Sequence, residues 1–368
     1  MATFSGEYVI PKSARGESGE PQAPVVIQVF AQTDVGRTRE HNEDSYIVAN
    51  LSGGEPLRFE RLVEQPADST ATLFMVADGM GGAAAGEVAS ATAVDVVLRH
   101  LREGLTGRGA LTPDELVTEL SKAADVANWS IFQHAVSRPE LRGMGTTATI
   151  AALLHDTLYL AQVGDSRAYL VRDGVATQLT KDQSLMQKLI EAGELTEEQA
   201  SHSERRNIIL QALGPEPNVK LDLTFQKLRR GDVLILCSDG LSGLVRAEQI
   251  AQVVNEELDL SVACDRLIAM ANDLGGPDNI TVVAARFEGH GLPAQGGDRV
   301  GYAEYALGGE TPADGDGDPT RAVTQPWPAG AATVDASRKW RGRIYTRIIA
   351  GIGAGLLLLA MWRLFAGR

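Results

Sequence analysis

The pattern of apolar and polar positions divides the chain into a central part rich in regular elements and two ends without periodicity. Short runs that are apolar, or that alternate with polar residues, predict strands. These runs cover residues 25–34, 45–49, 74–78, 146–154, 157–163, 168–172, 175–179, 219–225, 232–238 and 280–287. Apolar residues at helical spacing predict helices over 86–105, 111–136, 183–192, 247–255 and 261–274. Strands and helices that alternate in blocks predict an α+β layered sandwich and not a βαβ repeat.

The lengths of the connections predict which strands pair. The strand over 45–49 is expected to be the antiparallel partner of 25–34. The four short strands between 146 and 179 are expected to pair in antiparallel fashion, because tight turns join them. Residues 50–71 carry Gly, Pro and charge and are interpreted as an insertion loop. The polar segment 196–211 is either a flap over a site or a surface excursion, and the pattern does not distinguish the two.

Composition limits the classes of function. The 368 residues are 44% hydrophobic, enough for a sizeable core, while the net charge of −14 and the pI near 5.0 argue against a nucleic-acid binder. Two cysteines, Cys237 in an apolar strand and Cys264 in a helical pattern, indicate neither a disulfide framework nor a zinc site. The composition favours a globular protein of a reducing compartment that binds cations or small substrates.

Four aspartates stand beside glycines at the ends of predicted strands: Asp78, Asp165, Asp239 and Asp278. Taken alone, Asp78 fits an ordinary Asp-Gly turn, and the charged run 39–44 fits a solvated loop tip. Several unpaired carboxylates that meet in one cleft would repel each other strongly unless cations neutralise them. Oxygen ligands of this kind suit Mg²⁺ or Mn²⁺ rather than Zn²⁺, and two such ions can activate water for attack on a phosphate.

Seven short motifs follow one another in an order that resembles a known family. They are Thr33-Asp34-Val35-Gly36 with Arg39 and Asn42-Glu43-Asp44, Val76-Ala77-Asp78-Gly79-Met80-Gly81-Gly82, Gly143-Met144-Gly145-Thr146-Thr147, Val163-Gly164-Asp165-Ser166-Arg167, Leu179-Thr180-Lys181-Asp182, Cys237-Ser238-Asp239-Gly240-Leu241 and Gly276-Pro277-Asp278-Asn279. Over about residues 25–288 the chain resembles metal-dependent type 2C (PPM) protein serine/threonine phosphatases, of the bacterial type with a C-terminal membrane anchor. The resemblance implies a four-layer α-β-β-α sandwich with two central antiparallel sheets.

The resemblance also implies roles for individual residues. Asp78 would bridge two Mn²⁺ or Mg²⁺ ions, the carbonyl of Gly79 would hold one of them, and Asp239 and Asp278 would hold the other. Arg39 would clamp the substrate phosphate, because its planar guanidinium matches phosphate oxygens. Arg39, Asp78 and Asp239 are the residues predicted to be essential for catalysis.

Further acidic and polar residues are implied around these ions. Glu43 and Asp44 would lie beside the metals, either ordering bound waters or ligating directly. Asn279 would contact the residues around the metals without binding a metal itself. Asp165 resembles the residue that, together with Asp239, forms a third and weaker metal site in bacterial members.

One position departs from the animal members of the family. They commonly carry a histidine shortly after the metal-binding Asp-Gly, proposed as the general acid, where this chain has Met80. Bacterial members that resemble this chain also lack it, so the departure does not exclude activity. A metal-bound water is an alternative proton donor to the leaving serine oxygen.

Other phosphate chemistries find less support in the sequence. A cysteine-nucleophile phosphatase needs an arginine six positions after its cysteine, where this chain has Gly243 after Cys237 and Met270 after Cys264. The run 316–320 matches the aspartyl-nucleophile pattern of haloacid-dehalogenase-like phosphatases, but no apolar strand precedes it. The same run resembles the start of a calcium loop but lacks its glycine and glutamate. We interpret it as solvated linker.

The two ends are predicted to lie outside the catalytic domain, which spans residues 25–288. Residues 1–24 read as a disordered tail, and 289–343 as a flexible linker rich in Gly, Pro and Asp that ends in a basic stretch. The segment 344–366 would reach about 34 Å as a helix if Arg347 and Arg363 snorkel, enough to cross a bilayer core of about 30 Å. A buried or an interfacial helix is the alternative, although no core follows the linker for such a helix to join. Because most basic residues precede the segment, a single-pass anchor with a cytoplasmic catalytic domain is expected at the cell membrane.

The sequence as a whole predicts a membrane-anchored, metal-dependent phosphatase. It would hydrolyse phosphoserine and phosphothreonine on proteins, serine/threonine protein kinases among them, by attack of a metal-bound water. One alternative is a catalytically silent member that binds phosphoproteins as a signalling scaffold, although retention of Arg39, Asp78, Asp239 and Asp278 argues against it. A second alternative, a phosphatase dedicated to one small regulator, is not separable from a general one by sequence.

Overall fold

The computed structural model describes residues 25–51, 63–67, 71–81, 85–105, 107–108, 110–201, 203, 205–294 and 299–307. The predicted tail 1–24 and the predicted membrane segment 344–366 lie outside the described residues. No helix within the described ranges combines the length and the apolar character needed to span a membrane.

Two antiparallel sheets form the centre of the described domain. In spatial order, the first sheet contains β3 (Val63–Ala67), β1 (Val25–Asp34), β12 (Ile280–Glu288), β11 (Val233–Cys237), β8 (Arg167–Arg172) and β9 (Val175–Gln178). The second contains β10 (Asp222–Lys227), β7 (Thr157–Val163), β6 (Ala148–Leu154), β4 (Thr72–Met80) and β2 (Asp44–Asn50), and β5 (Gly145–Thr146) pairs with the end of β4.

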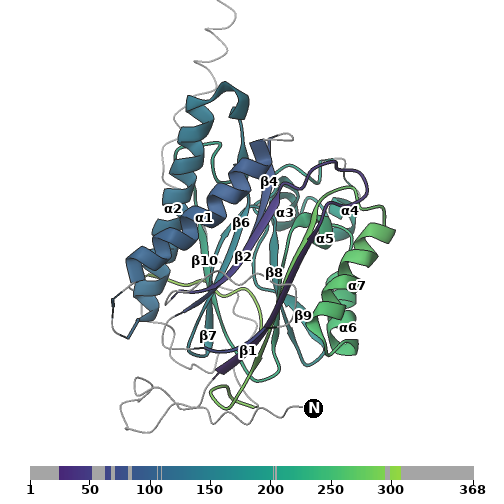
Figure 1. The fold of residues 1–368 in the computed structure, drawn as a ribbon. Helices are drawn as coiled ribbons and strands as arrows, with labels where there is room; N and C mark the ends of the chain where they lie inside the picture. The colour runs from purple at the N-terminus through teal and green to yellow at the C-terminus, as the bar shows by residue number, and fades with distance from the viewer. Residues whose placement is uncertain are drawn as a thin grey trace, which may run out of the picture. The chain divides into compact units, whose positions relative to one another are not determined.

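Helices cover the outer face of each sheet. Figure 1 shows α1 (Ala85–Leu105) and α2 (Pro113–Ser137) on the left of the sheets, and α6 (Ala247–Glu256) and α7 (Leu260–Asp273) on the right. Four shorter helices lie in the connections: η1 (Pro139–Leu141), α3 (Leu185–Glu191), α4 (Glu197–Ser201) and α5 (Asp239–Ser242). The predicted α+β sandwich with two central antiparallel sheets is confirmed.

The hydrophobic core fills the space between the layers. Phe74 on β4 meets Phe287 on β12 across the two sheets, with ring centroids 6.2 Å apart in an edge-to-face arrangement. On the other face of β4, Leu73 and Met75 pack among the buried residues of α1 and α2. Because β4 is covered on both faces, its residues 73–77 are continuously apolar instead of alternating with polar residues. This burial explains why the run before Asp78 is so distinct in the sequence.

Two predicted strand pairings are wrong. β2 does not pair with β1: β2 pairs with β4, whereas β1 pairs with β12 and β3 in the other sheet. Likewise β7 and β8, although only three residues apart in the chain, belong to different sheets. A short connection can cross between stacked sheets as readily as it can form a hairpin, and hydrophobic alternation does not tell the two apart.

Other segments differ from the sequence prediction in detail. The predicted insertion loop 50–71 contains β3, which pairs with the edge of β1. The polar segment 196–211 contains the short helix α4, and its end returns to the domain where the backbone N–H of Leu210 donates to the carbonyl of Gln183 at 2.7 Å. The strand predicted to begin at residue 219 begins at Asp222.

Part of the predicted linker packs against the domain. The backbone N–H of Phe225 on β10 donates to the carbonyl of Ala303 at 3.0 Å, and the N–H of Tyr305 donates to the carbonyl of Leu223 at 2.8 Å. The Tyr305 ring meets the rings of Tyr159 and Phe225 edge to face. Residues 299–307, which we call the strap, therefore cover the outer edge of the second sheet.

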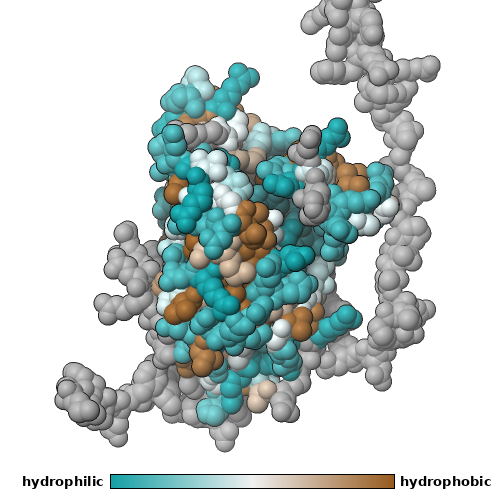
Figure 2. Space-filling view, turned by 90° about the vertical axis from the view of Figure 1, so that its right-hand side faces the viewer, coloured by the Kyte–Doolittle hydropathy of each residue, from teal (hydrophilic) through white to brown (hydrophobic). Residues whose placement is uncertain are grey.

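The face turned toward the viewer in Figure 2 is hydrophilic over most of its area, with apolar side chains gathered in small groups. Exposed apolar residues around α7 include Leu258 and Leu274, which are 82% and 56% exposed. Scattered exposed residues of this kind are normal on a globular surface.

Candidate metal centre

Asp44 and Asp78 meet at the end of the second sheet. Asp44 is the first residue of β2, and the antiparallel register places it directly opposite Asp78 on β4. The backbone of Asp78 is fixed, because its N–H bonds to Thr147 Oγ1 at 2.9 Å and its carbonyl accepts the N–H of Thr147 at 2.9 Å. The two carboxylates are therefore held side by side by regular strand pairing.

Gly79 follows Asp78 at a point where the backbone has no room for a side chain. A Cβ atom at this position would lie 2.2 Å from the carbonyl oxygen of Gly86 and 2.5 Å from that of Glu43. Gly79 has an ordinary strand conformation without a positive φ. Close packing of the chain, and not an unusual backbone angle, is thus the reason for glycine at this predicted ligand position.

Asp239 and Asp278 come from the first sheet. Asp239 begins α5, separated from the end of β11 by one residue, and Asp278 lies in the turn that leads into β12. The Asp278 carboxylate accepts a hydrogen bond from Arg39 Nη2 at 2.8 Å, and the Arg39 side chain is 44% exposed. Arg39 therefore lies beside the aspartates with its guanidinium open to solvent.

Asn279 fastens the loop that carries Arg39 to the start of β12. Its side-chain oxygen accepts the backbone N–H of Glu43 at 2.8 Å, and its Nδ2 donates to the carbonyls of Val35 and His41 at 3.0 and 2.9 Å. The Glu43 side chain is buried, with Oε2 3.9 Å from Arg39 Nη1. The two residues predicted to support the site thus position the loop between β1 and β2.

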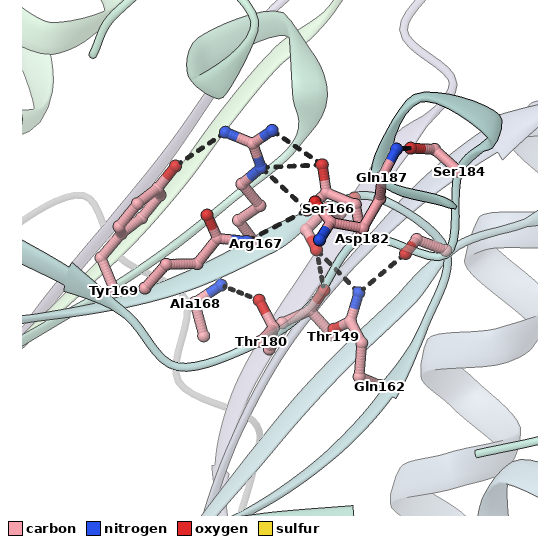
Figure 3. Close-up of polar contacts among 12 residues, drawn as sticks. Thr149, Gln162, Ser166, Arg167, Ala168, Tyr169, Thr180, Asp182, Ser184 and Gln187 are labelled. Carbon is pink, nitrogen blue, oxygen red and sulfur yellow. Dashed lines mark hydrogen bonds and ion pairs between the residues drawn. The ribbon is translucent and has the colours of Figure 1, made fainter. Parts of the chain in front are cut away.

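Asp165 lies in the short connection where the chain crosses from β7 to β8. Figure 3 shows the contacts that hold this turn. Arg167 forms a two-pronged ion pair with Asp182, with Nε 2.9 Å from Oδ1 and Nη2 2.7 Å from Oδ2. The carbonyl of Ser166 accepts bonds from Gln162 Nε2 at 2.8 Å and Thr149 Oγ1 at 3.0 Å. Sequence reasoning gave Arg167 and Asp182 no role, although both lie in recognised motifs.

The aspartates raise one another's pKa values. Burial, reinforced by the charge of Asp239, raises the pKa of both Asp44 and Asp165 to about 7. Burial and the neighbouring carboxylates, Asp44 first among them, also raise the pKa of Asp78 well above its usual range. The pKa of Asp239 is raised by burial and by Asp278. These mutual effects indicate that the five acids share one electrostatic site.

The donor set fits divalent cations. Asp44, Asp165 and Asp239 each have one buried carboxylate oxygen, Oδ1, with no hydrogen-bond partner in the described part of the chain. A buried polar atom without a partner is costly, and a cation that accepts carboxylate oxygens would remove this cost. Within the described ranges, no three acidic, histidine or cysteine side chains lie close enough together to form a complete set of metal ligands. The fit to Mn²⁺ or Mg²⁺ therefore rests on the unpartnered oxygens.

The structure bears on one of the rival chemistries that the sequence argues against, the cysteine nucleophile. Burial raises the pKa of the Cys237 thiol to about 12, so a thiolate nucleophile is unavailable near neutral pH. Two cavities of about 250 and 260 Å³ lie elsewhere on the domain, and none of the five aspartates lines them. The run 316–320 lies outside the described residues.

Known proteins resemble this chain over most of its length. A family profile described as protein phosphatase 2C matches residues 64–274. The serine/threonine phosphatase stp of Listeria innocua is 39% identical over 252 residues, which cover 68% of this chain and 92% of that protein. The serine/threonine protein phosphatase PstP of Mycobacterium tuberculosis is 37% identical over 262 residues, covering 71% of this chain and 45% of PstP.

Solved structures show the same fold. A serine/threonine phosphatase of S. agalactiae superposes with a TM-score of 0.61 at 32% identity, covering 71% of this chain and 99% of that structure. The catalytic domain of PstP in complex with two manganese ions superposes with a TM-score of 0.58 at 34% identity, covering 72% of this chain and 99% of that structure. The chain therefore belongs to the protein phosphatase 2C family of enzymes.

Proposed function

We propose that this chain hydrolyses phosphoserine and phosphothreonine on proteins and that it does so with two divalent ions, Mn²⁺ or Mg²⁺. One observation carries the proposal: five aspartates from both sheets share one electrostatic site, and three of them have a buried oxygen without a partner among the described residues. Such a cluster is stable with all its acids ionised only if positive charge is added to it. The relative PstP, whose catalytic domain has been solved with two manganese ions, supports this choice of metal.

The aspartates divide the task of holding the ions. Asp78, Asp239 and Asp278 would hold the two ions together with Asp44 and the carbonyl of Gly79, and Asp165 would hold a third, weaker ion together with Asp239. Bound Mn²⁺ or Mg²⁺ supplies positive charge to the phosphate oxygens and activates water for attack on phosphorus.

Arg39 would bind the substrate phosphate. Its side chain is 44% exposed, and its one side-chain hydrogen bond to Asp278 uses Nη2. Nη1 lies 3.9 Å from Glu43 Oε2, too far for a hydrogen bond, so N–H groups remain that can face an incoming phosphate. The ion pair with Asp278 keeps this cation over the aspartates, where the phosphate would lie between Arg39 and the metal ions. This arrangement fits a phosphate monoester that enters from solvent on the surface of a protein.

Phosphate release by the purified full chain tests the substrate class. With Mn²⁺ present, we expect release from a phosphothreonine peptide and much less from a phosphotyrosine peptide of the same sequence. Equal rates on the two peptides would contradict the assignment to phosphoserine and phosphothreonine. Release from neither peptide would favour the catalytically silent scaffold.

We also propose that residues 344–366 anchor the protein in the cell membrane with the catalytic domain in the cytoplasm, where phosphorylated proteins, including serine/threonine protein kinases, would be its partners. The support is the apolar run between flanking basic residues in the sequence. Deletion of 344–366 should move the protein from the membrane fraction to the soluble fraction. An unchanged distribution would contradict the anchor.

A further inference from the structure

The carboxylate of Asp44 is held by two hydroxyl groups that come from the opposite sheet. Asp44 begins β2 in the second sheet, whereas Thr281 lies on β12 and Ser238 directly follows β11 in the first. Both hydroxyls donate to the same carboxylate oxygen, Oδ2, at 2.7 Å each. The other oxygen, Oδ1, is one of the buried atoms without a partner in the described part of the chain. We call Thr281 and Ser238 the hydroxyl clamp.

The hydrogen bonds that link Thr281 to Thr33 and Asn42 have one direction, because each hydroxyl group has only one hydrogen to donate. The Thr281 hydroxyl has one hydrogen and gives it to Asp44, so in its 2.7 Å contact with Thr33 the hydroxyl of Thr33 is the donor. Thr33 accepts in turn from Asn42 Nδ2 at 2.8 Å. The chain of donors therefore runs inward from Asn42 and ends at Oδ2.

Backbone pairing sets the clamp in place. Thr33 and Thr281 are directly opposite each other in the register of β1 and β12. The backbone N–H of Thr281 donates to Ser238 Oγ at 3.0 Å, and the N–H of Ser238 donates to the carbonyl of Thr281 at 3.2 Å. The two hydroxyls of the clamp are thus fixed to each other, and Asp44 cannot rotate without breaking two short hydrogen bonds.

We propose that Thr281 and Ser238 are positioning residues that hold Asp44 by one oxygen and thereby keep the other available to a divalent cation. The inference rests on the proposed metal centre and goes beyond it, because it assigns the orientation of a carboxylate in one sheet to hydroxyls of the other. Partners of this kind fix the geometry of a ligating group and raise metal affinity. The clamp also joins the two sheets at the end where the aspartates gather.

Substitutions at Thr281 distinguish the effect of the hydroxyl group from the effect of side-chain volume. Thr281→Val preserves the volume but removes the donor, and we expect it to lower Mn²⁺ affinity by about 10-fold. Thr281→Ser keeps the hydroxyl and should restore affinity to within about 2-fold of the wild type. Ser238→Ala removes the second donor and should also lower affinity by about 10-fold.

Thr72→Val is the matched control. Thr72 is buried on β4 at the opposite end of the strand from Asp78, and its hydroxyl has no partner within the described ranges. This change removes a buried hydroxyl without touching the clamp. It should leave Mn²⁺ affinity unchanged.

The experiment measures Mn²⁺ binding by titration calorimetry on the full chain, with the folded fraction of each metal-free variant measured by circular dichroism. The expected result is weaker binding in Thr281→Val and Ser238→Ala, beyond any loss of folded protein, with rescue in Thr281→Ser. If Thr281→Val does not fold, Ser238→Ala decides alone.

Two results would overturn the clamp while the proposed function stands, because the wild type would still bind Mn²⁺. One is wild-type affinity in the variants that lack a donor, and the other is a loss of affinity that follows the folded fraction. Failure of Thr281→Ser to restore binding would count against the clamp as well. A wild-type chain that binds no Mn²⁺ contradicts the proposed function, and the clamp with it.

Discussion

Asp239 and Arg39 both belong to the candidate site, but their chemistry gives them different tasks. Asp239→Asn should reduce kcat by at least about 100-fold, because it removes a carboxylate that would hold a metal ion. Arg39→Ala should mainly raise KM, because it weakens phosphate binding and leaves the aspartates in place. Steady-state kinetics on a phosphothreonine peptide check both. Wild-type turnover in Asp239→Asn would contradict the assignment of that residue to the metal centre.

The raised pKa values of Asp44 and Asp165 predict how the metal-free protein responds to pH. Each pKa is about 7 in the folded protein, against a usual value of 3.8 that the unfolded chain would have. Between these values the unfolded chain has lost the protons that the folded protein keeps, so the free energy of unfolding falls as pH rises. The contribution that these two raised pKa values make to the free energy of unfolding is fully present below about pH 4 and is lost as pH rises through about 7.

We therefore expect the Tm of the metal-free protein to be lower at about pH 8 than at about pH 5. Asp44→Asn has no titrating group at this position, so its Tm should depend less on pH than that of the wild type. Mn²⁺ should reduce the fall in the Tm of the wild type between these two pH values, because a cation favours the ionised carboxylates. Differential scanning calorimetry with a chelator and with Mn²⁺ measures all three. A Tm that rises from pH 5 to pH 8 without metal would show that these acids are not protonated in the folded state.

At the scale of residues, the sequence predicts the acids better than it predicts the groups that hold them. Asp78, Asp239 and Asp278 stand out because each lies at one end of a buried strand, next to a glycine or two residues from one. The pair of Thr33 and Thr281 does not, because its members are 248 positions apart and meet only through the pairing of β1 with β12. Short polar side chains inside a strand are common, so nothing local marks these two as partners of Asp44.

Among the elements, two connections that cross between sheets carry part of the site. The loop from β1 to β2 brings Arg39, Glu43 and Asp44, and the turn from β7 to β8 brings Asp165. The hydrophobic pattern predicts that these strands exist, because burial determines the pattern. It does not predict which sheet each strand joins, because both sheets offer similar apolar surfaces. The misassigned pairs β1–β2 and β7–β8 therefore lie at two of the connections that carry residues of the site.

The turn between β7 and β8 gives a prediction for Asp165. If Asp165 helps to hold a weaker third ion, Asp165→Ala should leave the ions held by Asp78, Asp239 and Asp278 in place but slow the turnover of large phosphoproteins. The Arg167–Asp182 ion pair holds the turn independently of Asp165, so stability should change little. Metal stoichiometry, Tm and kcat are measured on one preparation. Unchanged activity with three ions still bound would show that Asp165 is no ligand.

In the whole molecule, the described domain extends beyond residues 64–274, the part that the family profile matches. The strap, residues 299–307, lies within the predicted linker, and its composition gave no sign that it would pack. Besides its backbone hydrogen bonds to β10, the strap makes contacts through two aromatic residues, Tyr302 and Tyr305. Tyr302 lies under Lys181, whose Nζ is 4.3 Å from the ring centroid, and the hydroxyl of Tyr305 donates to Asp114 at 2.6 Å.

Tyr305→Ala should destabilise the domain by about 1–2 kcal/mol, because it removes two edge-to-face ring contacts and uncovers the edge of β10. Leu307→Ala, at a strap position that is 46% exposed, is the control and should have little effect. Urea unfolding of the full chain compares the two. Equal stability of both variants would show that the strap does not contribute to the fold.

The central claim is that the cluster of aspartates works through divalent metal ions, and removal and return of the metal tests it most directly. Phosphate release from a phosphothreonine peptide is measured on the full chain before chelation, after chelation and after addition of Mn²⁺, with Cys237→Ala in parallel. The account predicts activity that vanishes with the chelator, returns with Mn²⁺, and does so equally in Cys237→Ala. Activity that survives removal of all bound metal, or that depends on Cys237, would contradict it.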